Sequence, residues 1–191
     1  NKLKINSFSF NTSDLNKNYF LDYLKKIKFK SDQMNVIVSS VVPNVTKLII
    51  SVLKNKKIHF YYVGDLIKCF DLKTNIINKK NIGDDRLVNV IYAKNLYLKS
   101  VIVIDFGTAT TIDVLDKFGI YDGGIITPGI DLSLKSLHIG TAKLPLVKFR
   151  KTKRIVGKNT VEAIRSGFFW GYISMIKGLV HKIELEKKYT F

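Results

Sequence analysis

Cysteine and histidine are scarce in this chain of 191 residues. Its single cysteine, Cys69, cannot form an internal disulfide, and its three histidines lie far apart, without the spacing of metal ligands. The histidines are His59, His138 and His181. We expect them to be packed or surface residues. This composition argues against a disulfide scaffold or a zinc site, and it fits a reducing, cytoplasmic setting.

The sequence also lacks a hydrophobic run long enough to cross a membrane. Its most hydrophobic window, residues 167–176, meets Lys177 well short of the roughly 20 residues that a membrane span needs. No signal peptide is recognised at the start. The chain begins at Asn1 without an initiator Met and ends at Phe191 just after a helical pattern. We therefore expect a fragment of a longer protein that makes no membrane contact.

Acidic residues are few, 15 against 32 basic ones, which gives a formal net charge of +17. Such a balance is typical of proteins that bind nucleic acid or an anionic surface. However, 28 of the basic residues are lysine and only four are arginine. Lysine, asparagine, isoleucine and tyrosine are encoded by A/T-rich codons, so genome composition can explain the charge. Specific phosphate readers favour arginine, and we therefore expect no nucleic-acid partner.

Regular alternation of apolar segments is the main positive signal. The periodicity predicts strands at 7–10, 36–38, 58–63, 101–104, 112–115, 120–121 and 125–126. Helical spacing is predicted at 20–27, at 45–53, after Gly83, at 130–137 and from residue 159 onward. Residues 101–104 are apolar at every position, which is typical of a strand covered on both faces. The fold class is therefore α/β, with lobes over residues 1–98 and 99–191.

The final helix has a face with little bulk. Ala163, Gly167 and Gly171 recur at every fourth position along it. We expect another backbone to approach the helix closely there.

The tripeptide Asp105-Phe106-Gly107 holds magnesium in protein kinases. Neither the His-Arg-Asp catalytic loop nor the Gly-rich loop of those enzymes accompanies it, and no Walker-type run occurs. Thr108, Thr110 and Thr111 instead place hydroxyls around a turn between two strands. Such a turn can present NH groups and hydroxyls to phosphate oxygens, and Asp105 can offer a carboxylate to a cation. The alternative interpretation is a purely structural Thr-rich hairpin with an aspartate that stabilises its turn.

Two further short segments, residues 83–86 and 157–160, each allow a ligand-binding and a purely structural interpretation. Gly83-Asp84-Asp85-Arg86 precedes an apolar-periodic segment, as at a helix N-terminus that binds anions, and Arg86 adds a fork for a carboxylate. The two acidic residues can equally serve the helix dipole alone. Residues 157–160, Gly-Lys-Asn-Thr, fit either a binding site or an ordinary capped helix.

Taken together, the clusters resemble the type III pantothenate kinases, a family of the actin-like and sugar-kinase superfamily. The similarity extends from residue 38 to residue 180. Its segments are Ser-Ser-Val-Val-Pro at 39–43, Gly-Asp-Asp-Arg at 83–86, Asp-Phe-Gly-Thr-Ala-Thr-Thr at 105–111, Gly-Gly-Ile-Ile-Thr-Pro-Gly at 123–129, Leu-Pro at 144–145 and Gly-Lys-Asn-Thr at 157–160. Each is short, but their order and spacing are specific. The resemblance implies two actin-like, ribonuclease H-like lobes with a cleft between them.

The same resemblance implies ATP-dependent phosphorylation of pantothenate to 4'-phosphopantothenate, the first step of coenzyme A biosynthesis. By this resemblance Asp85 accepts the proton of the pantothenate hydroxyl and is the catalytic residue. Asp105 binds a monovalent cation, K⁺ or NH₄⁺, and Mg²⁺ accompanies ATP. The implied substrate-binding residues are Gly83, Asp84, Asp85, Arg86 and Thr160, and the implied ATP-binding residues are Gly107, Thr108 and Thr110. A homodimer interface would close the pantothenate pocket, and the small-residue face of the last helix could serve there.

The sequence departs from the family pattern at three places. The opening Asp-x-Gly-Asn-Thr turn would belong before Asn1, and a later Gly-Gly segment would lie beyond Phe191, so we expect both lobes to be incomplete. Ile76 and Lys79 stand where the family usually has an aromatic residue and a proline. Because the first phosphate motif is absent, a catalytically inactive relative that acts as a binding or regulatory protein is the alternative.

Overall fold

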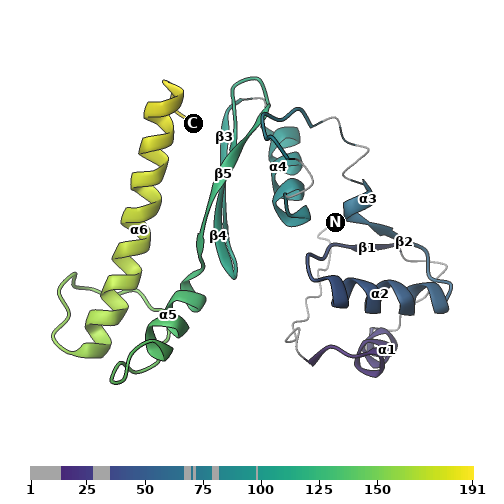
Figure 1. Cartoon of the computed structure of the whole chain (residues 1–191), viewed down its shortest axis with the longest axis horizontal. Coiled ribbons are helices and arrows are strands. Elements are labelled where there is room, and N and C mark those ends of the chain that lie inside the picture. The colour runs from purple at the N-terminus through teal and green to yellow at the C-terminus, as the bar shows by residue number, and fades with distance from the viewer. Residues whose placement is uncertain (1–13, 28–34, 67–69, 71, 79–81, 98) are drawn as a thin grey trace, which may run out of the picture. The chain divides into compact units, whose positions relative to one another are not determined.

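The computed structural model describes residues 14–27, 35–66, 70, 72–78, 82–97 and 99–191. The strand predicted at 7–10, together with Cys69 and Lys79, lies outside these residues. The chain forms two compact units (Figure 1), one made of Asn1–Asp71 with Asn81–Val88 and the other of Leu72–Lys80 with Asn89–Phe191. The lobe boundary near residue 98 stays a prediction, and the division between the compact units falls within a helix.

The first unit contains a parallel strand pair with a helical crossover. Strands β1 (Val36–Val38) and β2 (Phe60–Tyr62) pair in parallel, with Val38 opposite Tyr62. Helix α2 (Pro43–Asn55) connects them, as parallel pairing requires. The unit also holds α1 (Lys17–Lys26), α3 (Val63–Leu66) and the start of α4 (Asp84–Leu96). The strands and helices predicted for this part of the chain are confirmed within its described residues.

The core of the first unit lies between α1, α2 and the strands. Leu53 is fully buried, and Val38 and Ile58 pack with it. Phe20 and Leu24 cover this cluster from α1, as their helical spacing predicts. Helix α1 begins after Asn16, whose side chain accepts a hydrogen bond from Tyr19 N at 3.0 Å. Helix α2 begins with Pro43 at its first position.

The second unit is built on an antiparallel meander. Strands β3 (Val101–Phe106), β4 (Ala109–Leu115) and β5 (Tyr121–Pro128) form a sheet in the order β3-β4-β5. The central strand β4 is buried from Thr110 to Leu115, whereas β3 is half-buried or exposed along its length. Residues 101–104, which the sequence predicts to be covered on both faces, are half-buried at every position. The position in the sheet, and not apolarity alone, decides which strand is covered.

Strand β5 is continuous where two short strands were predicted. Gly123, at a φ of +117°, and Gly124 carry the strand from Tyr121 to the apolar residues 125–126. The register against β4 shifts beside Val114 and Leu115. A residue with a side chain would be strained at such a positive φ, so glycine allows the irregularity.

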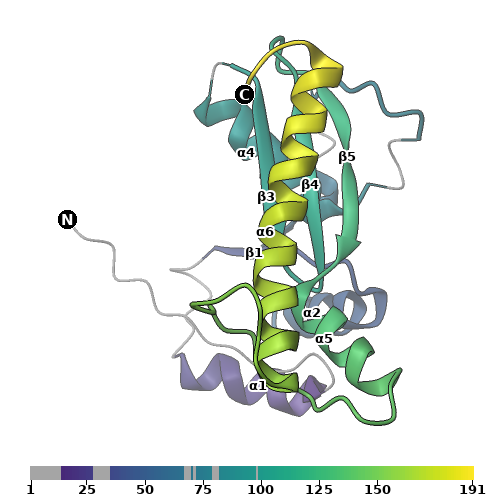
Figure 2. The same cartoon turned by 90° about the vertical axis from the view of Figure 1, so that its left-hand side faces the viewer.

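Helices cover both faces of the meander. Helix α6 (Thr160–Lys187) runs along one face (Figure 2), where Ile183 joins a buried cluster with Ile112 and Val114. The second half of α4 lies on the other side of the sheet (Figure 1), where Val90 and Ala93 are buried. Helix α5 (Ile130–Ile139) packs on the start of α6 through Leu134 and Ile164. The α/β class is confirmed.

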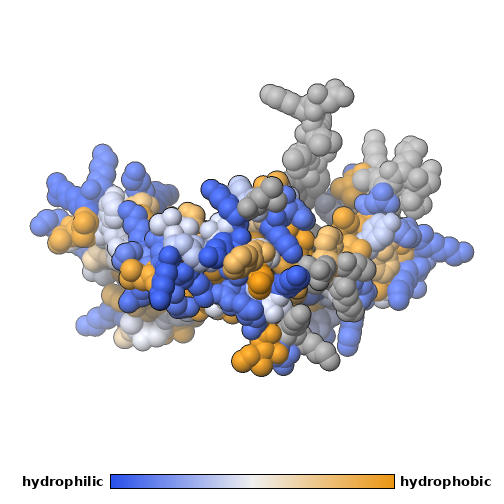
Figure 3. All heavy atoms as spheres, turned by 90° about the horizontal axis from the view of Figure 1, so that it is seen from above, coloured by the Kyte–Doolittle hydropathy of each residue, from blue (hydrophilic) through white to orange (hydrophobic). Residues whose placement is uncertain are grey.

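The described residues contain no helix that could span a membrane. Seen from above (Figure 3), the hydrophobic residues of the visible face form separate patches among hydrophilic ones.

Candidate functional site

Two of the recognised segments meet in the first unit. A pocket of about 390 Å³ is lined by Ser40, Val41 and Pro43 from the turn after β1 and by Gly83 and Asp84 from the start of α4. Thr46, Lys47, Tyr62 and Ile82 complete its lining. Segments about 40 residues apart in the sequence thus contribute to one concave surface. The contact between the 39–43 and 83–86 motifs is a property of this fold that neither motif shows alone.

The two neighbouring aspartates of α4 have different surroundings. Asp84 is half-buried, and its Oδ2 accepts a hydrogen bond from the Tyr62 hydroxyl at 3.2 Å. A side chain on Gly64 would begin 2.8 Å from that carboxylate, so glycine allows this approach. Asp85 is exposed, and its Oδ1 accepts from Arg86 N at 2.8 Å. Asp84 is therefore held by the protein, while the outer part of the Asp85 carboxylate faces solvent.

Two other recognised segments meet at the hairpin between β3 and β4. Gly129 N donates to Thr108 O at 2.8 Å, and a Cβ on Gly129 would lie only 2.1 Å from Gly107 O. No other amino acid fits such a backbone contact. The end of the 123–129 segment therefore supports the turn of the 105–111 segment directly. This contact fixes the position of Thr108, whose side chain is exposed.

The polar side chains of this hairpin divide into exposed and buried groups. Asp105 is exposed at the end of β3, and its Oδ2 accepts from Asn89 Nδ2 at 3.1 Å. Thr110 is only 1% exposed, and Thr111 is 9% exposed. Neither buried hydroxyl has a hydrogen-bond partner among the described residues. Asp105 and Thr108 are thus directly accessible to a ligand, whereas Thr110 stands behind them.

The segment 157–160 begins α6 with a reciprocal cap. Asn159 Oδ1 accepts from Glu162 N at 2.9 Å, and Glu162 Oε2 accepts from Lys158 N at 3.0 Å. Thr160, the first helical residue, is exposed. The capped-helix interpretation of this segment is confirmed, and it leaves the Thr160 hydroxyl available to a ligand.

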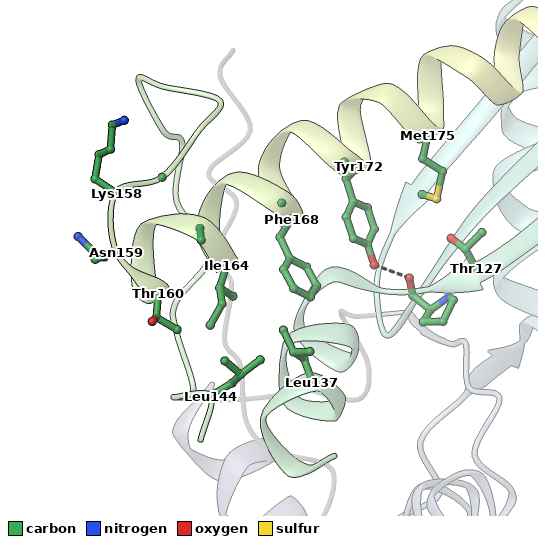
Figure 4. A pocket seen from close by; sticks show the side chains of 15 residues that line it. Thr127, Leu137, Leu144, Lys158, Asn159, Thr160, Ile164, Phe168, Tyr172 and Met175 are labelled. Carbon is green, nitrogen blue, oxygen red and sulfur yellow. Dashed lines mark hydrogen bonds between the residues drawn. The ribbon is translucent and has the colours of Figure 1, made fainter. Parts of the chain in front are cut away.

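An apolar groove of about 840 Å³ lies beside this cap (Figure 4). Thr127 and Pro128 end β5 at one side of it, where the Tyr172 hydroxyl donates to Pro128 O at 2.8 Å. Leu137, Leu144, the cap residues 157–160 and one face of α6, which includes Ala163, Gly167 and Gly171, line the rest. Four recognised segments, at 105–111, 123–129, 144–145 and 157–160, are therefore neighbours in the second unit through the hairpin and this groove.

The small-residue face of α6 contacts another backbone at one end only. A Cβ on Gly157 would lie 2.4 Å from Ala163 N, so the loop before the helix approaches closely there. At Gly167 and Gly171 no atom of the chain lies within 4 Å of an added Cβ. The predicted close approach is confirmed at Ala163, and the two glycines border the open groove.

The described residues contain no group of three or more metal-ligating His, Cys, Asp or Glu side chains. Asp105 offers a single exposed carboxylate at the end of β3. Oxygen donors of this kind suit a hard cation that is only partly enclosed by protein. The donor set thus fits a monovalent cation or a cation that arrives with a phosphate ligand.

Comparison with known proteins identifies the family. The family model described as type III pantothenate kinase matches residues 2–182. The chain belongs to the type III pantothenate kinase family.

Curated relatives carry the same name. The chain is 40% identical over 181 residues to the type III pantothenate kinase of Sulfurihydrogenibium sp., an alignment that covers 93% of this chain and 69% of the relative. It is 39% identical over 181 residues to that of Persephonella marina, covering 93% and 68%. With that of Paramagnetospirillum magneticum it shares 48% identity over 124 residues, which cover 65% of this chain and 48% of the relative. The chain thus spans about half to two thirds of these type III pantothenate kinases.

A solved structure has a similar fold. It was described as a conserved Baf family transcriptional activator from Campylobacter jejuni, and it superposes with a TM-score of 0.55 at 25% identity. The match covers 86% of this chain and 69% of that one.

Two residues that hold the implied site were missed in the sequence. Tyr62 and Asn89 donate to Asp84 and Asp105, respectively. Tyr62 lies in an aromatic strand, which favours packing as its role, and Asn89 is one amide in a helix. Their roles can be recognised only when distant segments are seen to pack together, because both hydrogen bonds join residues at least 16 positions apart.

Proposed function

We propose that this protein transfers a phosphoryl group from ATP to the hydroxyl of pantothenate, giving 4'-phosphopantothenate in the first step of coenzyme A biosynthesis. The observation that carries the proposal is the exposed Asp85 carboxylate at the start of α4, in a chain whose residues 2–182 match this family. Membership alone makes a kinase the expected activity. The exposed carboxylate supplies the group that the reaction needs.

Asp85 orients the attacking hydroxyl and accepts its proton. Phosphoryl transfer depends mainly on alignment and on neutralisation of charge, so a carboxylate of ordinary acidity can serve. The hydrogen bond from Arg86 N to Oδ1 fixes one oxygen and leaves Oδ2 for the substrate. The hydroxyl proton passes to the Asp85 carboxylate, the substrate oxygen bonds to the γ-phosphorus of ATP, and the bond from that phosphorus to the β,γ-bridging oxygen breaks, which releases ADP.

The substrate is held around this carboxylate. Gly83 and Asp84 belong to the pocket of the first unit, and the half-buried Arg86 can pair with the pantothenate carboxylate. Thr160 contributes a hydroxyl from the start of α6. That Thr160 and Asp85 act on one substrate is part of the proposal, since they belong to different compact units.

The hairpin after Asp105 binds the nucleotide. Thr108 offers an exposed hydroxyl and Gly107 leaves room for a phosphate beside the turn. The buried Thr110 supports them from within β4. Asp105 binds K⁺ or NH₄⁺, and Mg²⁺ bound with ATP would supply charge neutralisation on the phosphates. The proposal places the hairpin and Asp85 in one cleft between two actin-like lobes.

The setting of the enzyme belongs to the same proposal. A homodimer would close the pantothenate pocket, and the cytoplasm is its expected compartment. The open groove beside Gly167 and Gly171 provides a surface on which another chain could pack.

A phosphorylation assay of the full-length protein tests the proposal. Purified protein is incubated with ATP, Mg²⁺ and pantothenate, and 4'-phosphopantothenate is measured by mass spectrometry, with a parallel sample that lacks K⁺. We expect product in the first sample and much less in the second. A full-length protein that binds pantothenate but forms no product would instead support the inactive relative.

A further inference from the structure

A basic pocket lies beside the start of α6, apart from the residues assigned to the kinase reaction. It has a volume of about 350 Å³ and is lined by Arg150, Lys151, Thr152, Lys153, Arg154, Gly157, Glu162 and Arg165. Three of the four arginines of the whole chain belong to it. Outside this pocket the chain has 26 lysines and only one arginine, Arg86, so codon bias does not explain this concentration.

The loop that carries the pocket is fixed to α6. Ser166 is buried, and its hydroxyl donates to the carbonyl of Ile155 and lies 3.3 Å from that of Arg154. Gly157 packs its backbone against Ala163 so closely that a Cβ would lie 2.4 Å from the Ala163 nitrogen. The basic side chains therefore project from an anchored segment, which limits the entropy lost when they converge on a ligand.

Two buried donors in this pocket have no partner. The Thr152 hydroxyl and the Arg165 Nε are both inaccessible to solvent and make no hydrogen bond among the described residues. Buried polar groups are nearly always paired, so each unpaired one calls for a ligand or water. Both can donate to an oxygen atom. Their presence in one pocket points to an acceptor-rich ligand.

The charges in the pocket are unbalanced. Five cationic side chains face one carboxylate, that of Glu162, which already accepts from Lys158 N. Within the described ranges, no carboxylate forms an ion pair with Arg150, Arg154 or Arg165. Guanidinium groups bind phosphate through paired, nearly parallel hydrogen bonds, which lysine cannot form. A single carboxylate ligand would leave most of this charge uncompensated.

We propose that the basic pocket binds a small ligand bearing a phosphate or pyrophosphate group with at least two negative charges. A concave pocket of this volume accommodates such a group, whereas nucleic-acid backbones need an extended basic groove. The Arg165 Nε and the Thr152 hydroxyl bind its oxygens at the base of the pocket. Arg150 and Arg154 bind it at the exposed rim.

Calorimetry of the full-length protein with inorganic pyrophosphate tests the site. A non-hydrolysable ATP analogue is present at saturation, so that the nucleotide site does not contribute to the signal. Glycerol 3-phosphate serves as a phosphate monoester, and a twelve-nucleotide single-stranded RNA tests for a nucleic-acid ligand.

The variants separate specific recognition from general charge. Arg150→Gln/Arg154→Gln removes two rim guanidiniums, and Lys54→Gln/Lys56→Gln removes the same charge from exposed positions on and just after α2. Arg165→Lys keeps the charge but removes the fork and Nε. Circular dichroism and the thermal midpoint verify that each variant is folded. Arg150 and Arg154 are exposed, so the rim variant tests the site even if substitution of the half-buried Arg165 impairs folding.

We expect pyrophosphate to bind to one site per chain, and the rim variant to bind it at least about tenfold more weakly. We expect Arg165→Lys to weaken binding several-fold and the α2 control to change it less than twofold. Equal weakening in the rim and control variants, or unchanged binding in Arg165→Lys, would overturn the proposal. So would the absence of pyrophosphate binding at millimolar concentration, or tighter binding of RNA that the rim variant abolishes.

Discussion

Each compact unit contains an aspartate that accepts a hydrogen bond from a tyrosine hydroxyl and, in one of the recognised motifs, an aspartate that is exposed. In the first unit, Tyr62 donates to Asp84, and Asp85 is exposed. In the second, Tyr121 donates to the buried Asp113 at 2.5 Å, and Asp105 is exposed. By the resemblance, Asp85 is the catalytic residue and Asp105 the cation ligand, while Asp84 belongs to the substrate-binding residues. The tyrosine occupies one oxygen of each of these two carboxylates, Asp84 and Asp113, and the hydrogen bond contributes to the stability of the fold.

The largest expected effect is at Asp85. We expect Asp85→Asn to reduce kcat by about 10²–10⁴-fold, since the amide cannot accept the substrate proton. Folding and ATP binding should stay largely intact because the side chain is exposed. Steady-state kinetics and calorimetry of the full-length protein measure both quantities.

A matched control for this change is Asp22→Asn on α1, whose side chain is 65% exposed and far in sequence from the motifs. We expect it to keep normal turnover. Near-normal turnover of Asp85→Asn would remove Asp85 from its proposed role and weaken the contrast between exposed and held aspartates.

Asp105 should affect activation by cations more than the chemical step. We expect Asp105→Asn to weaken the apparent affinity for K⁺ about tenfold, because the substitution removes the charged ligand of a hard cation. Rates measured across a K⁺ titration, at constant ionic strength, give the apparent affinity. An unchanged K⁺ dependence would count against the assignment.

The hydrogen bonds from Tyr121 to Asp113 and from Tyr62 to Asp84 should affect the stability of the fold and not the reaction. Tyr121→Phe removes the hydroxyl that donates to Asp113, whose exposed fraction is 1%. We expect a loss of about 1–3 kcal/mol in the free energy of unfolding. The half-buried counterpart Tyr62→Phe should cost less, about 0.5–1.5 kcal/mol. Urea unfolding measures both, and a larger loss for Tyr62→Phe would contradict the ranking by burial.

The smallest expected effect concerns an aspartate paired with a lysine. Asp122 accepts from Asn75 Nδ2 at 2.8 Å and forms an ion pair with Lys187 at the end of α6. The Asn75 amide and then the Lys187 ammonium hold the pKa of the Asp122 carboxyl below its usual value. Asp122 stabilises the fold above its unfolded pKa, near 4, and this contribution is lost as the pH falls through the lower folded pKa.

We therefore expect Asp122→Asn to lower the free energy of unfolding by about 0.5–1 kcal/mol at pH 7 and by less at pH 3. The pKa of Lys187 is raised, chiefly by its hydrogen bond to Asp122, so the lysine stays charged across this range. Urea titrations at the two pH values measure the difference. An equal loss at both would show that the ion pair contributes no pH-dependent stability.

Most elements could be predicted because their patterns are local. The spacing of Val45, Leu48 and Leu53 predicts α2, and Asn159 followed by a long periodic segment predicts α6. The continuity of β5 was not predictable from apolar runs, because two glycines interrupt them. The order of strands in the meander was not predictable either, and burial of β4 follows from that order.

The candidate site could be predicted only as residue types. The motifs name Asp84 and Asp85 together, but nothing in their order indicates that Tyr62 holds the first and leaves the second exposed. Likewise, the Asp-Phe-Gly segment does not reveal that Gly129 supports its turn. Both facts depend on contacts between distant segments, which hydrophobic periodicity does not encode.

The amino-acid sequence by itself determined the α/β class, the positions of most helices and strands, and the motifs that lead to the kinase family. These depend on local propensities and on short, ordered patterns of residues. Only the tertiary structure decided which carboxylates are exposed, which hydroxyls are buried, and that three arginines converge on one pocket. Burial and convergence arise when segments pack, because removal from water is a property of neighbours in space and not of neighbours in the chain.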